Sequence, residues 1–598
     1  MPQLTDATFS INGNTVSVFK TFSLTQNIFD HHHFTLVCPA EAIDGKEGLF
    51  TNSRDMIGAS FGARIEAISF DTVTAPAGGL LFKGIVTGVE TSRFTGHHGD
   101  VIITGYSPTI MLDTGPHCQS WEKKAVKNIA QDVLKDFPQN LIDPKIKPLY
   151  GETLAYTVQY KETAWEFLKR LTATYGEWLF WDGQSLIVGP PRSEVKTQLT
   201  YGAHLSRFNM SLQARPLTTG YVAWDYMNSQ VYTSMPKDIV QKAGLNPWGE
   251  KVMQQSRNIY NTRPKMHNNR FTTNLKQQDD LVTLRTAMES SRMVQFQGQS
   301  GHPGVNIGTM IETSGSNVFT GATEGYGQYL ITGISHFVDV QGNYENEFTA
   351  VPYSIKVPPI SAPAEPVCET QSALVTDNND YKGLGRVRVK FHWMGSGEKT
   401  PWIRVAAPHG GGSKGHFFIP EIGEEVLVAF EGDSAIKPYV IGTVYHGQAN
   451  NSFSNEGNDI KVIQTRSGTK VRMNDAEGSI FIEDPSGNTW FMDGQGNISV
   501  NAPKNVNIVA GENLNISVGK DMKTQIGNNN IVNITEKHQF ASRNYSQNVA
   551  DRKDIVVGGE LQETTAKTTH KAIKGDVLIQ SAGVSKILGA IDAKINKG

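Results

Sequence analysis

The C-terminal part of the chain carries an eight-residue repeat, and this repeat limits the possible folds more than any other feature. Gly511, Gly519 and Gly527 recur at intervals of eight. Apolar residues occupy mainly the even-numbered positions around them, namely Ile498, Val500, Val506, Ile508, Leu514, Ile516, Val518, Met522, Ile526, Val532 and Ile534. An apolar period of two predicts strands with one buried face and excludes a helix. Each octad therefore predicts one short strand followed by a glycine corner, where a positive φ costs little.

A strand of this length cannot bury its apolar face alone, so repetition and a partner are required. Octads stacked in a single chain would leave unpaired strand edges, which favour pairing with further copies. We therefore expect three chains to wind around one another and to form a stiff rod. The repeat weakens in the sequence after Ile534, where apolar runs return at 555–557 and 577–579.

A second all-β module is expected before the repeat. Residues 386–393 alternate strictly between apolar and basic side chains, which predicts a half-buried strand. Further strands are predicted at 402–405, 425–430 and 439–444. Short strands at this spacing are typical of a small closed or Greek-key barrel. The expected core of this barrel consists of Val387, Val389, Phe391, Trp393, Val426 and Val428.

The N-terminal part of the chain mixes strands with helices. Strands are predicted at 81–89 and 101–104, and helices at 120–137, 163–175 and 279–294. Ser120 is the expected N-cap of the first helix. We expect these helices to pack on β-barrels. Five prolines between residues 352 and 366 predict an extended linker to the next module.

Composition excludes several classes of protein. Hydrophobic residues make up 38% and charged residues 19% of the 598 residues, so the chain is not disordered. A formal charge of −3 argues against binding to nucleic acid or an anionic membrane through bulk charge. Three scattered cysteines do not suggest a disulfide framework, and no apolar run is long enough to span a membrane. Without a visible signal peptide, we expect the chain to fold in the cytoplasm and to leave the cell by another route.

No stretch predicts a catalytic, cofactor or metal site. Consecutive histidines at 31–33 alternate faces in a strand and cannot converge on one ion, which favours a structural role. His409 and His416 flank three glycines without the spacing of a phosphate-binding loop, so a flexible barrel loop is expected. His538 and His570 lie too far apart to hold a metal together. No convincing nucleophile or zinc-protease motif is present, and we expect no enzyme activity.

Motifs spread along the chain resemble one family. They are WEFLKRL at 165–171, YGEWLFWDG at 175–183, GHPGVNIG at 301–308, GISH at 333–336, YENEF at 344–348, GLGRVRV at 383–389 and PEIGEEV at 420–426, followed by the octads. The first five resemble the hub of phage tails, the next two an OB-fold module, and the octads a phage needle. In this order they resemble the valine–glycine repeat protein G (VgrG) spikes of type VI secretion systems, most closely those of Bacteroidetes.

The resemblance implies a mainly β protein with some α-helix. Its parts would be a β-barrel hub with packed helices (1–365), an OB-fold domain (366–447) and an intertwined trimeric β-helix, or β-prism, needle (448–598). It also implies a homotrimer that caps a tube of Hcp hexamers, contacts baseplate proteins, carries a PAAR-repeat tip protein with effectors or their adaptors, and pierces the target envelope with only transient mechanical contact. The tip protein would dock at Ile591, Ile595 and Asn596.

The chain departs from the family pattern in two ways. Phage needles of this type carry a lysozyme domain, but here only residues 446–459 separate the OB module from the rod. No toxin domain is expected either.

Other functions can be compared with the spike. The alternative is the hub-spike of an extracellular contractile injection particle, a tailocin or a phage tail. Nucleic-acid binding by the OB strands is disfavoured by the charge. A tail-spike depolymerase is disfavoured because the outward octad positions are chiefly Asn, Ser, Lys and Gln.

Overall fold

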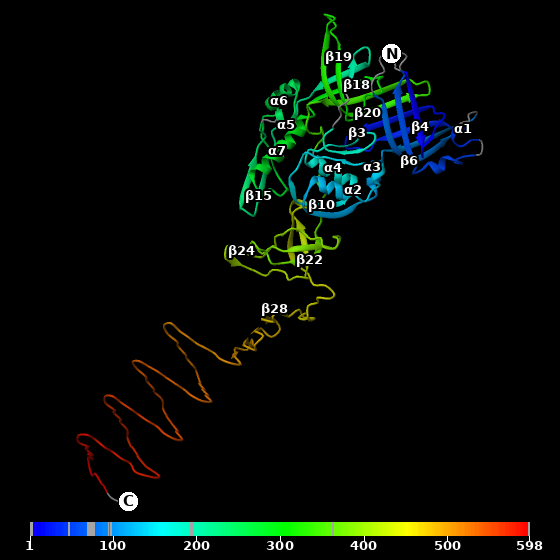
Figure 1. The fold of residues 1–598 in the computed structure, drawn as a ribbon. Helices are drawn as coiled ribbons and strands as arrows, with labels where there is room; N and C mark the ends of the chain where they lie inside the picture. Colours follow the sequence, from blue (N-terminus) through cyan, green and yellow to red (C-terminus); the bar gives the residue numbers. More distant parts are fainter. Residues whose placement is uncertain are drawn as a thin grey trace. The chain divides into compact units, whose positions relative to one another are not determined.

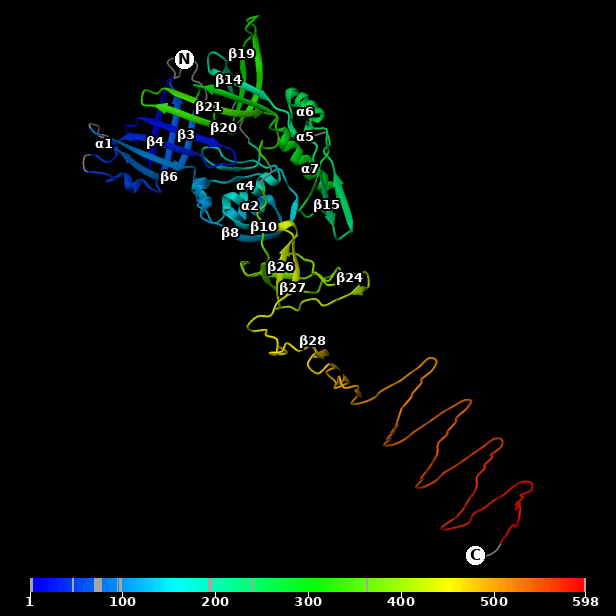
Figure 2. The same ribbon diagram turned by 180° about the vertical axis from the view of Figure 1, so that it is seen from behind.

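The computed structural model describes residues 4–45, 48–68, 78–93, 95, 99–191, 196–237, 240–361 and 364–595. The chain forms two compact units, residues 1–464 with 471–480 and residues 465–470 with 481–598, and each is described by itself. Figures 1 and 2 show strands as the dominant element from the blue N-terminus to the yellow OB region. The predicted mainly β architecture with a minority of helices is confirmed.

One 13-stranded sheet forms the body of the hub in the first unit. Its strands are β1 (Thr5–Ile11), β2 (Asn14–Thr15), β3 (Thr21–Asn27), β4 (His33–Pro39), β5 (Ser60–Ala67), β6 (Leu80–Ser92), β7 (Asp100–Tyr106), β13 (Lys196–Thr200), β14 (Leu205–Leu212), β18 (Val294–Ser300), β19 (Met310–Ser316), β20 (Thr323–Asp339) and β21 (Tyr344–Pro352). The order is β14-β18-β21-β20-β3-β4-β7-β6-β5-β1-β2, with β19 joining β13 to β20.

The hub sheet is an open path instead of the expected separate barrels. The long strand β20 pairs with β19 along its first half and with β3 along its second half, so it joins two curved half-sheets into one. The β1 edge reaches the β20–β21 turn through an isolated bridge between Leu4 and Asn343 and through hydrogen bonds from Thr5 N and Oγ1 to Gly342 O, at 3.0 and 3.1 Å. The strand pairing of the described residues therefore follows one path through β20 and shows no closed ring of paired strands.

Smaller elements cover this sheet (Figure 1). Three small sheets contain β8 (His117–Ala125) with β10 (Thr153–Glu162); β9 (Lys145–Ile146), β11 (Leu179–Trp181) and β12 (Leu186–Val188); and β15 (Gly220–Asp225), β16 (Gln230–Ser234) and β17 (Lys265–His267). The helical segments are α1 (Ala40–Ile43), η1 (Ser53–Met56), η2 (Pro108–Asp113), α2 (Val126–Leu134), α3 (Gln139–Ile142), α4 (Ala164–Thr174), α5 (Val240–Ala243), α6 (Pro247–Ile259) and α7 (Leu275–Ser290), where η marks a 3-10 turn.

Of the three predicted helices, one is confirmed, one is shorter than predicted and one begins and ends earlier. The prediction for α4 is confirmed, because Thr163 and Glu166 form a capping box at its start and Gly176 adopts φ +71° just after its end. The first half of the predicted helix at 120–137 is wrong. Residues of β8 pair with β10, as in Trp121 opposite Thr157, so long-range pairing overrides the local pattern. The third helix, α7, begins earlier than predicted, at an Asn274 cap, and ends before β18.

The proline-rich segment is not a free linker along its whole length. Ile355 and Val357 are buried in one of the two hub cores, and Lys356 N donates to Ala243 O at 3.1 Å. The prolines interrupt strand pairing after β21, but the apolar residues between them still find hub partners. Pro363 lies outside the described residues.

The OB module follows as a small sheet ordered β23-β22-β26-β27. Its elements are β22 (Gln371–Asp377), β23 (Arg388–Phe391), the β24 (Gly410–Gly411) and β25 (Lys414–Gly415) ribbon, β26 (Glu425–Phe430), η3 (Glu431–Asp433) and β27 (Pro438–Thr443). The predicted strand at 402–405 is reduced to two bridges, Val387–Ile403 and Val405–Val440. These bridges connect the two edge strands, so the sheet curls into a partly open barrel.

Five short strands then lead into the repeat. They are β28 (Ile460–Gln464), β29 (Lys470–Asn474), β30 (Ser479–Glu483), β31 (Thr489–Met492) and β32 (Ile498–Asn501). Beyond them the chain runs as an extended zigzag, drawn orange to red in Figures 1 and 2. Every described residue from 503 to 595 is exposed in the single chain. No helix among the described residues is long and apolar enough to cross a membrane.

Candidate functional site

The apolar column of the repeat is a long series of exposed apolar side chains. Its members, Ile498, Val500, Val506, Ile508, Leu514, Ile516, Val518, Met522, Ile526, Val532 and Ile534, are exposed by 47–72%. Some apolar side chains outside the column are more exposed, as at Val509 (92%) and Val556 (94%), and others less, as at Val549 (42%). Between the described residues 502 and 595 there is no hydrogen bond from one backbone group to another. Such a long stretch of unpaired backbone groups and exposed apolar side chains requires partner strands from outside the single chain.

The corners of the repeat differ from the sequence expectation in one way. Gly511, Gly519 and Gly527 do lie at bends, but the expected positive φ is wrong at all three. The apolar pattern weakens in the sequence after Ile534, yet bends continue at intervals of about eight, at 535–536, 543, 550–551, 558–559, 566, 573–575, 582–583 and 590–591. Because the corners at 511, 519 and 527 do not use left-handed backbone, residues other than glycine can occupy such corners, and the later octads are harder to see in the sequence.

The residues expected to receive a tip protein lie at and just after the last described bend of the repeat, at 590–591. Ile591 is fully exposed and Ile595 is 88% exposed in the single chain. Asn596 lies outside the described residues.

The OB-core residues of the sequence prediction lie together. Val387, Val389, Phe391, Val426 and Val428 are fully buried in one cluster. Trp393 is half-buried against the cluster, stacks on Phe391 with ring centroids 5.4 Å apart, and donates from Nε1 to Gln371 Oε1 at 2.9 Å.

Hub and OB module share this core, which sequence reasoning missed. Tyr156, Val158 and Tyr160 of the hub strand β10 are buried in the same cluster as the OB side chains. The ion pair between Arg388 of β23 and Glu122 of β8 lies at the same junction. Residues 156–160 of β10 are buried on both faces, so the strand needs a second layer, but their sequence YTVQY is not the continuous apolar run that would predict this.

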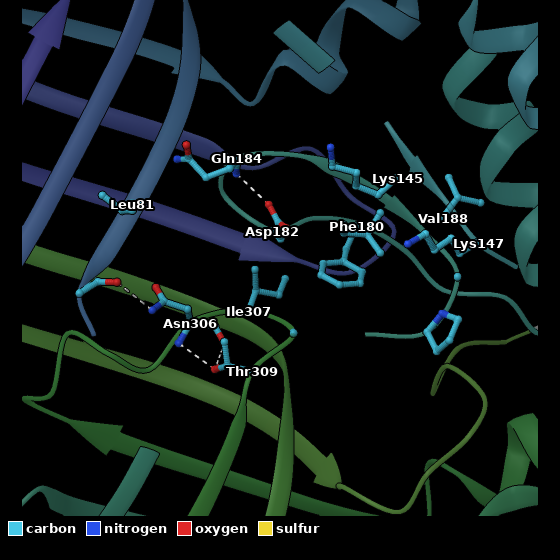
Figure 3. A pocket seen from close by; sticks show the side chains of 15 residues that line it. Leu81, Lys145, Lys147, Phe180, Asp182, Gln184, Val188, Asn306, Ile307 and Thr309 are labelled. Carbon is cyan, nitrogen blue, oxygen red and sulfur yellow. Dashed lines mark hydrogen bonds between the residues drawn. The ribbon is translucent and has the colours of Figure 1, made fainter. Parts of the chain in front are cut away.

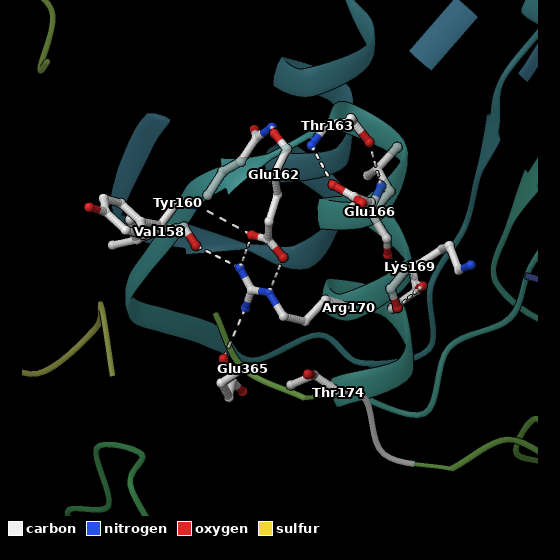
Figure 4. A network of polar contacts seen from close by, with 12 residues as sticks. Val158, Tyr160, Glu162, Thr163, Glu166, Lys169, Arg170, Thr174 and Glu365 are labelled. Atoms are coloured by element: carbon white, nitrogen blue, oxygen red, sulfur yellow. Dashed lines mark hydrogen bonds and ion pairs between the residues drawn. The ribbon is translucent and has the colours of Figure 1, made fainter. Parts of the chain in front are cut away.

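A buried ion-pair network continues this junction (Figure 4). Arg170 of α4 binds Glu162 through Nε and Nη2, at 2.6 and 2.7 Å, and its Nη2 also donates to Val158 O at 2.7 Å. Its Nη1 lies 3.1 Å from Glu365, whose other oxygen accepts from Arg270 at 2.6 Å. Burial opposes ionisation of Glu365, but the charges of Arg270 and Arg170 lower the pKa of this carboxyl. The network ties the segment before the OB module to the hub.

A second ion pair fixes the same segment four residues further on. The carboxylate of Glu369 accepts hydrogen bonds from Lys161 and from Tyr160, which lower its pKa to about 2. Within the OB module, the Arg386 guanidinium holds the pKa of Asp380 well below its usual range. Both carboxylates are therefore charged at neutral pH and have their partners within the chain.

The three consecutive histidines pack against aromatic rings or form hydrogen bonds within the hub. His31 stacks on Trp165 with centroids 4.4 Å apart, and His33 packs edge-on against Tyr106. His32 is fully buried, with Nδ1 2.9 Å from Gln26 Nε2. The other end of Gln26 faces the buried His336, and burial lowers the pKa of His32 and of His336 to about 3. Both rings are neutral packing groups at physiological pH.

A half-open cleft of about 460 Å³ lies in the hub beside β11 and β12 (Figure 3). Phe180, Ile187 and Ile307 give it an apolar floor, and Lys145 and Asp182 lie at its edge. Lys145 is paired with Asp143 at 2.7 Å, and Asp182 Oδ1 accepts from the backbone N of Gln184 and of Ser185. Lys145 and Asp182 thus serve local contacts, and the third charged side chain that lines the cleft is Lys147. Among the described lining residues, no carboxylate is paired with a histidine for acid–base chemistry.

The glycine segment flanked by His409 and His416 forms the β24–β25 ribbon. Its sequence GGSKG has the spacing of a nucleophile motif, but Ser413 sits at an exposed hairpin turn with φ +57°. A nucleophile elbow requires a strand-to-helix turn, which is not what these residues form. Among the described residues, no group of three or more His, Cys, Asp or Glu is placed to hold a metal ion.

Comparison with known families matches both modules of the first unit. Residues 48–342 match the phage tail baseplate hub (GPD) family. Residues 371–445 match the OB domain of type VI secretion and phage-baseplate injectors. The two matched segments follow one another in the order of hub and OB module described above.

Two of the curated relatives, both from Pseudomonas aeruginosa, illustrate the similarity. The chain is 22% identical over 487 residues to the type VI secretion spike protein VgrG1b, which covers 71% of this chain and 63% of that protein. It is 40% identical over 118 residues to the spike protein VgrG4b, which covers 18% of this chain and 14% of that protein. The matched segments thus span less than two thirds of these relatives.

A solved complex of PdpA and VgrG from Francisella shares the fold, with a TM-score of 0.55 at 8% identity over 83% of this chain and 80% of that one. The hub and OB matches, their order along the chain and the shared spike relatives agree with one another. The chain belongs to the VgrG family of type VI secretion spike proteins, with a phage-type baseplate hub joined to an OB domain.

Proposed function

We propose that this protein is the non-enzymatic, homotrimeric spike of a contractile injection machine of the type VI secretion class. One observation carries the proposal: from residue 503 to residue 595 a regular octad chain exposes its apolar column and its backbone hydrogen-bonding groups. Three such chains wound together would pair every strand edge and would bury the column at a common axis. The hydrogen-bonded ladder between chains would give a stiff rod.

The rod acts mechanically. Contraction of a sheath drives it forward, and it pierces the target envelope with transient membrane contact. The hub caps a tube of Hcp hexamers and meets the baseplate, while a PAAR-repeat protein seats on the last octads. The shared hub–OB core and the Arg170 network support this proposal, because axial force must pass from the hub to the rod through that junction.

Cargo travels as separate proteins bound to the spike or through adaptors. The solved Francisella structure is a complex of VgrG with the protein PdpA, which supports a partner role for this fold. The chain assembles in the cytoplasm and is then injected into the target cell. Nucleic acid is not a partner, in agreement with the net charge of −3.

The mass of the purified chain in solution, measured by light scattering on a sizing column, tests the proposal. We expect three times 65.6 kDa, about 197 kDa, with early elution because of the rod. A stable 65.6-kDa monomer would mean that the octads close on themselves, and the spike proposal would fail. Incubation with peptidoglycan or polysaccharide substrates should leave them intact, and any clearing would contradict the non-enzymatic role.

The alternative is the hub-spike of an extracellular injection particle, a tailocin or a phage tail. The matched family descriptions support it, since they name phage baseplates beside type VI secretion. The genes that flank this one distinguish the two readings: a membrane-anchoring complex indicates secretion, and a tail-fibre or capsid gene indicates a particle.

A further inference from the structure

A rigid hairpin with an apolar tip projects from the hub, and no function above uses it. The tip lies between β19 and β20 and carries Val318 and Phe319, which are 92% and 96% exposed. These are the two most exposed large apolar side chains among the described residues of the first unit. Two adjacent apolar side chains held at the end of a projection form a knob that favours insertion into a pocket.

The loop at the tip is held in one shape. Asn317 Oδ1 accepts from the backbone N of Phe319 at 3.0 Å and of Thr320 at 3.1 Å. Asn317 N donates to Ala322 O at 2.8 Å, which closes the loop. With the turn fixed by these bonds, Val318 and Phe319 remain outside it instead of folding back. A knob that is already ordered loses little conformational entropy on binding.

The stem of the hairpin, the paired strands β19 and β20 below the tip, contacts other hub residues on both strands as far as Ser314. β13 pairs with β19 as far as Thr200 opposite Ser314, and the next residue, Tyr201, donates its backbone N to Ser314 O at 2.7 Å. On the other strand, the Tyr326 ring packs on Phe208 with centroids 4.9 Å apart. Beyond Ser314 only the two strands of the hairpin remain, so the last turn stands free on a stiff base.

The position and chemistry of the tip select its partner. In both views the hairpin rises from the end of the first unit that lies away from the OB strands β22, β26 and β27 (Figures 1 and 2). In the proposed spike the OB module leads in sequence into the octads, so the tube would meet the end of the first unit that lies away from the OB module, where the tip projects. Residues 315–323 carry no charge, which disfavours an anionic lipid surface. A neighbouring copy in a ring would lie beside the hub and not beyond its end.

We propose that the Val318–Phe319 knob docks into an apolar pocket on the end ring of the Hcp tube, so that three knobs of a trimer seat the spike on its tube. This inference rests on the proposed function, because it needs both the trimer and the tube. The knob then acts as an anchor residue pair of that interface, and the paired strands of the stem provide reach.

The test compares the full-length parent, the Val318→Ser/Phe319→Ser double variant and the Leu149→Ser variant. Leu149 is a matched control, since it is 68% exposed on the same unit but lies outside the hairpin. Each protein is titrated with purified hexameric rings of the cognate Hcp, and its mass and thermal midpoint are measured in parallel. We expect the double variant to keep trimer mass and thermal midpoint but to bind rings about tenfold or more weakly. Leu149→Ser should match the parent.

Three outcomes would overturn the knob proposal. Ring binding equal to that of the parent would show that the knob is not the anchor. Loss of trimer mass in the double variant would assign the knob to a second copy, while the proposed trimer would stand. Knob-dependent binding of the parent to vesicles of phosphatidylglycerol and phosphatidylethanolamine, without ring binding, would assign it to a membrane. A parent that is itself a monomer contradicts the proposed function, which separates that failure from the other three.

Discussion

The hub–OB unit and the octad rod differ in how they bury apolar side chains and pair their backbone hydrogen-bonding groups. In the first unit, Trp178, Trp181, Tyr329 and Phe391 are buried among other side chains of the same chain. In the rod, every described residue from 503 to 595 is exposed, including each member of the apolar column. One region satisfies its backbone and apolar groups within a single chain, and the other leaves them for further chains.

This contrast predicts where assembly and stability reside. A unit with its own core can fold before any partner arrives, because burial within the chain offsets its conformational entropy. A rod of bare octads cannot, so its folding depends on chain concentration and is inseparable from trimerisation. Changes in the rod should therefore affect oligomeric state first, and changes in the hub should affect the unfolding of each protomer.

Replacing Ile516 by Asp should have the largest effect. Three carboxylates would meet near the axis of the rod, and buried unpaired charges repel one another and cost several kcal/mol. We expect loss of the 197-kDa species (three times 65.6 kDa) while the hub–OB unit stays folded, measured by light scattering and circular dichroism. The matched control is Asn515→Asp at the neighbouring outward position, which should remain trimeric. Trimers of unchanged stability for Ile516→Asp would reverse the assignment of the two faces.

Lowering the pH should have the second-largest effect, because it should destabilise the hub and leave the rod unchanged. Burial lowers the pKa of His32 and His336 from 6.5 to about 3, so the unfolded chain binds protons that the folded hub excludes between these values. Stability is therefore full above pH 6.5 and falls as the pH decreases toward 3. At pH 5 the loss amounts to about 2 kcal/mol per histidine, since one pKa unit corresponds to about 1.4 kcal/mol.

Urea unfolding followed by tryptophan fluorescence at pH 7 and pH 5 measures this loss, because most tryptophans lie in the hub and OB modules. The His336→Gln variant should show a smaller difference between the two pH values than the parent, and replacement of the exposed His267 should not. The rod, whose His538 and His570 are exposed in the single chain, should keep its trimer over this range. Equal hub stability at both pH values would contradict the buried-histidine account.

The sequence was sufficient where local and global forces agree. The capping residues Thr163 and Glu166 define α4 in both, and the alternation of Val387, Val389 and Phe391 predicts a buried face that lies in the OB core. The sequence prediction failed where contacts between residues far apart in the chain determine the local structure. The segment around Trp121 has a helical pattern but pairs with β10, and the side chains of β10 enter the OB core although the two are far apart in sequence. The hairpin knob gave no periodic signal at all, since two apolar residues in a turn are common.

The corner glycines provide the smallest and most discriminating comparison. Gly519 lies at a bend without positive φ, and a methyl group added there would meet no atom within 4 Å in the single chain. Gly183 in the hub turn has φ +103°, and a methyl group there would lie 2.3 Å from Leu81 O. We expect Gly519→Ala to change the stability of the trimer by less than about 1 kcal/mol, because Ala restricts the unfolded chain without strain in the folded one. Gly183→Ala should destabilise the hub by about 1–3 kcal/mol through backbone strain and the clash. Denaturant unfolding of both variants beside the parent measures the two values. A large loss at Gly519 would mean that a neighbouring chain packs against that corner, and then the later octads, whose corners are Thr535, Arg543 and Ala566, could not share its geometry.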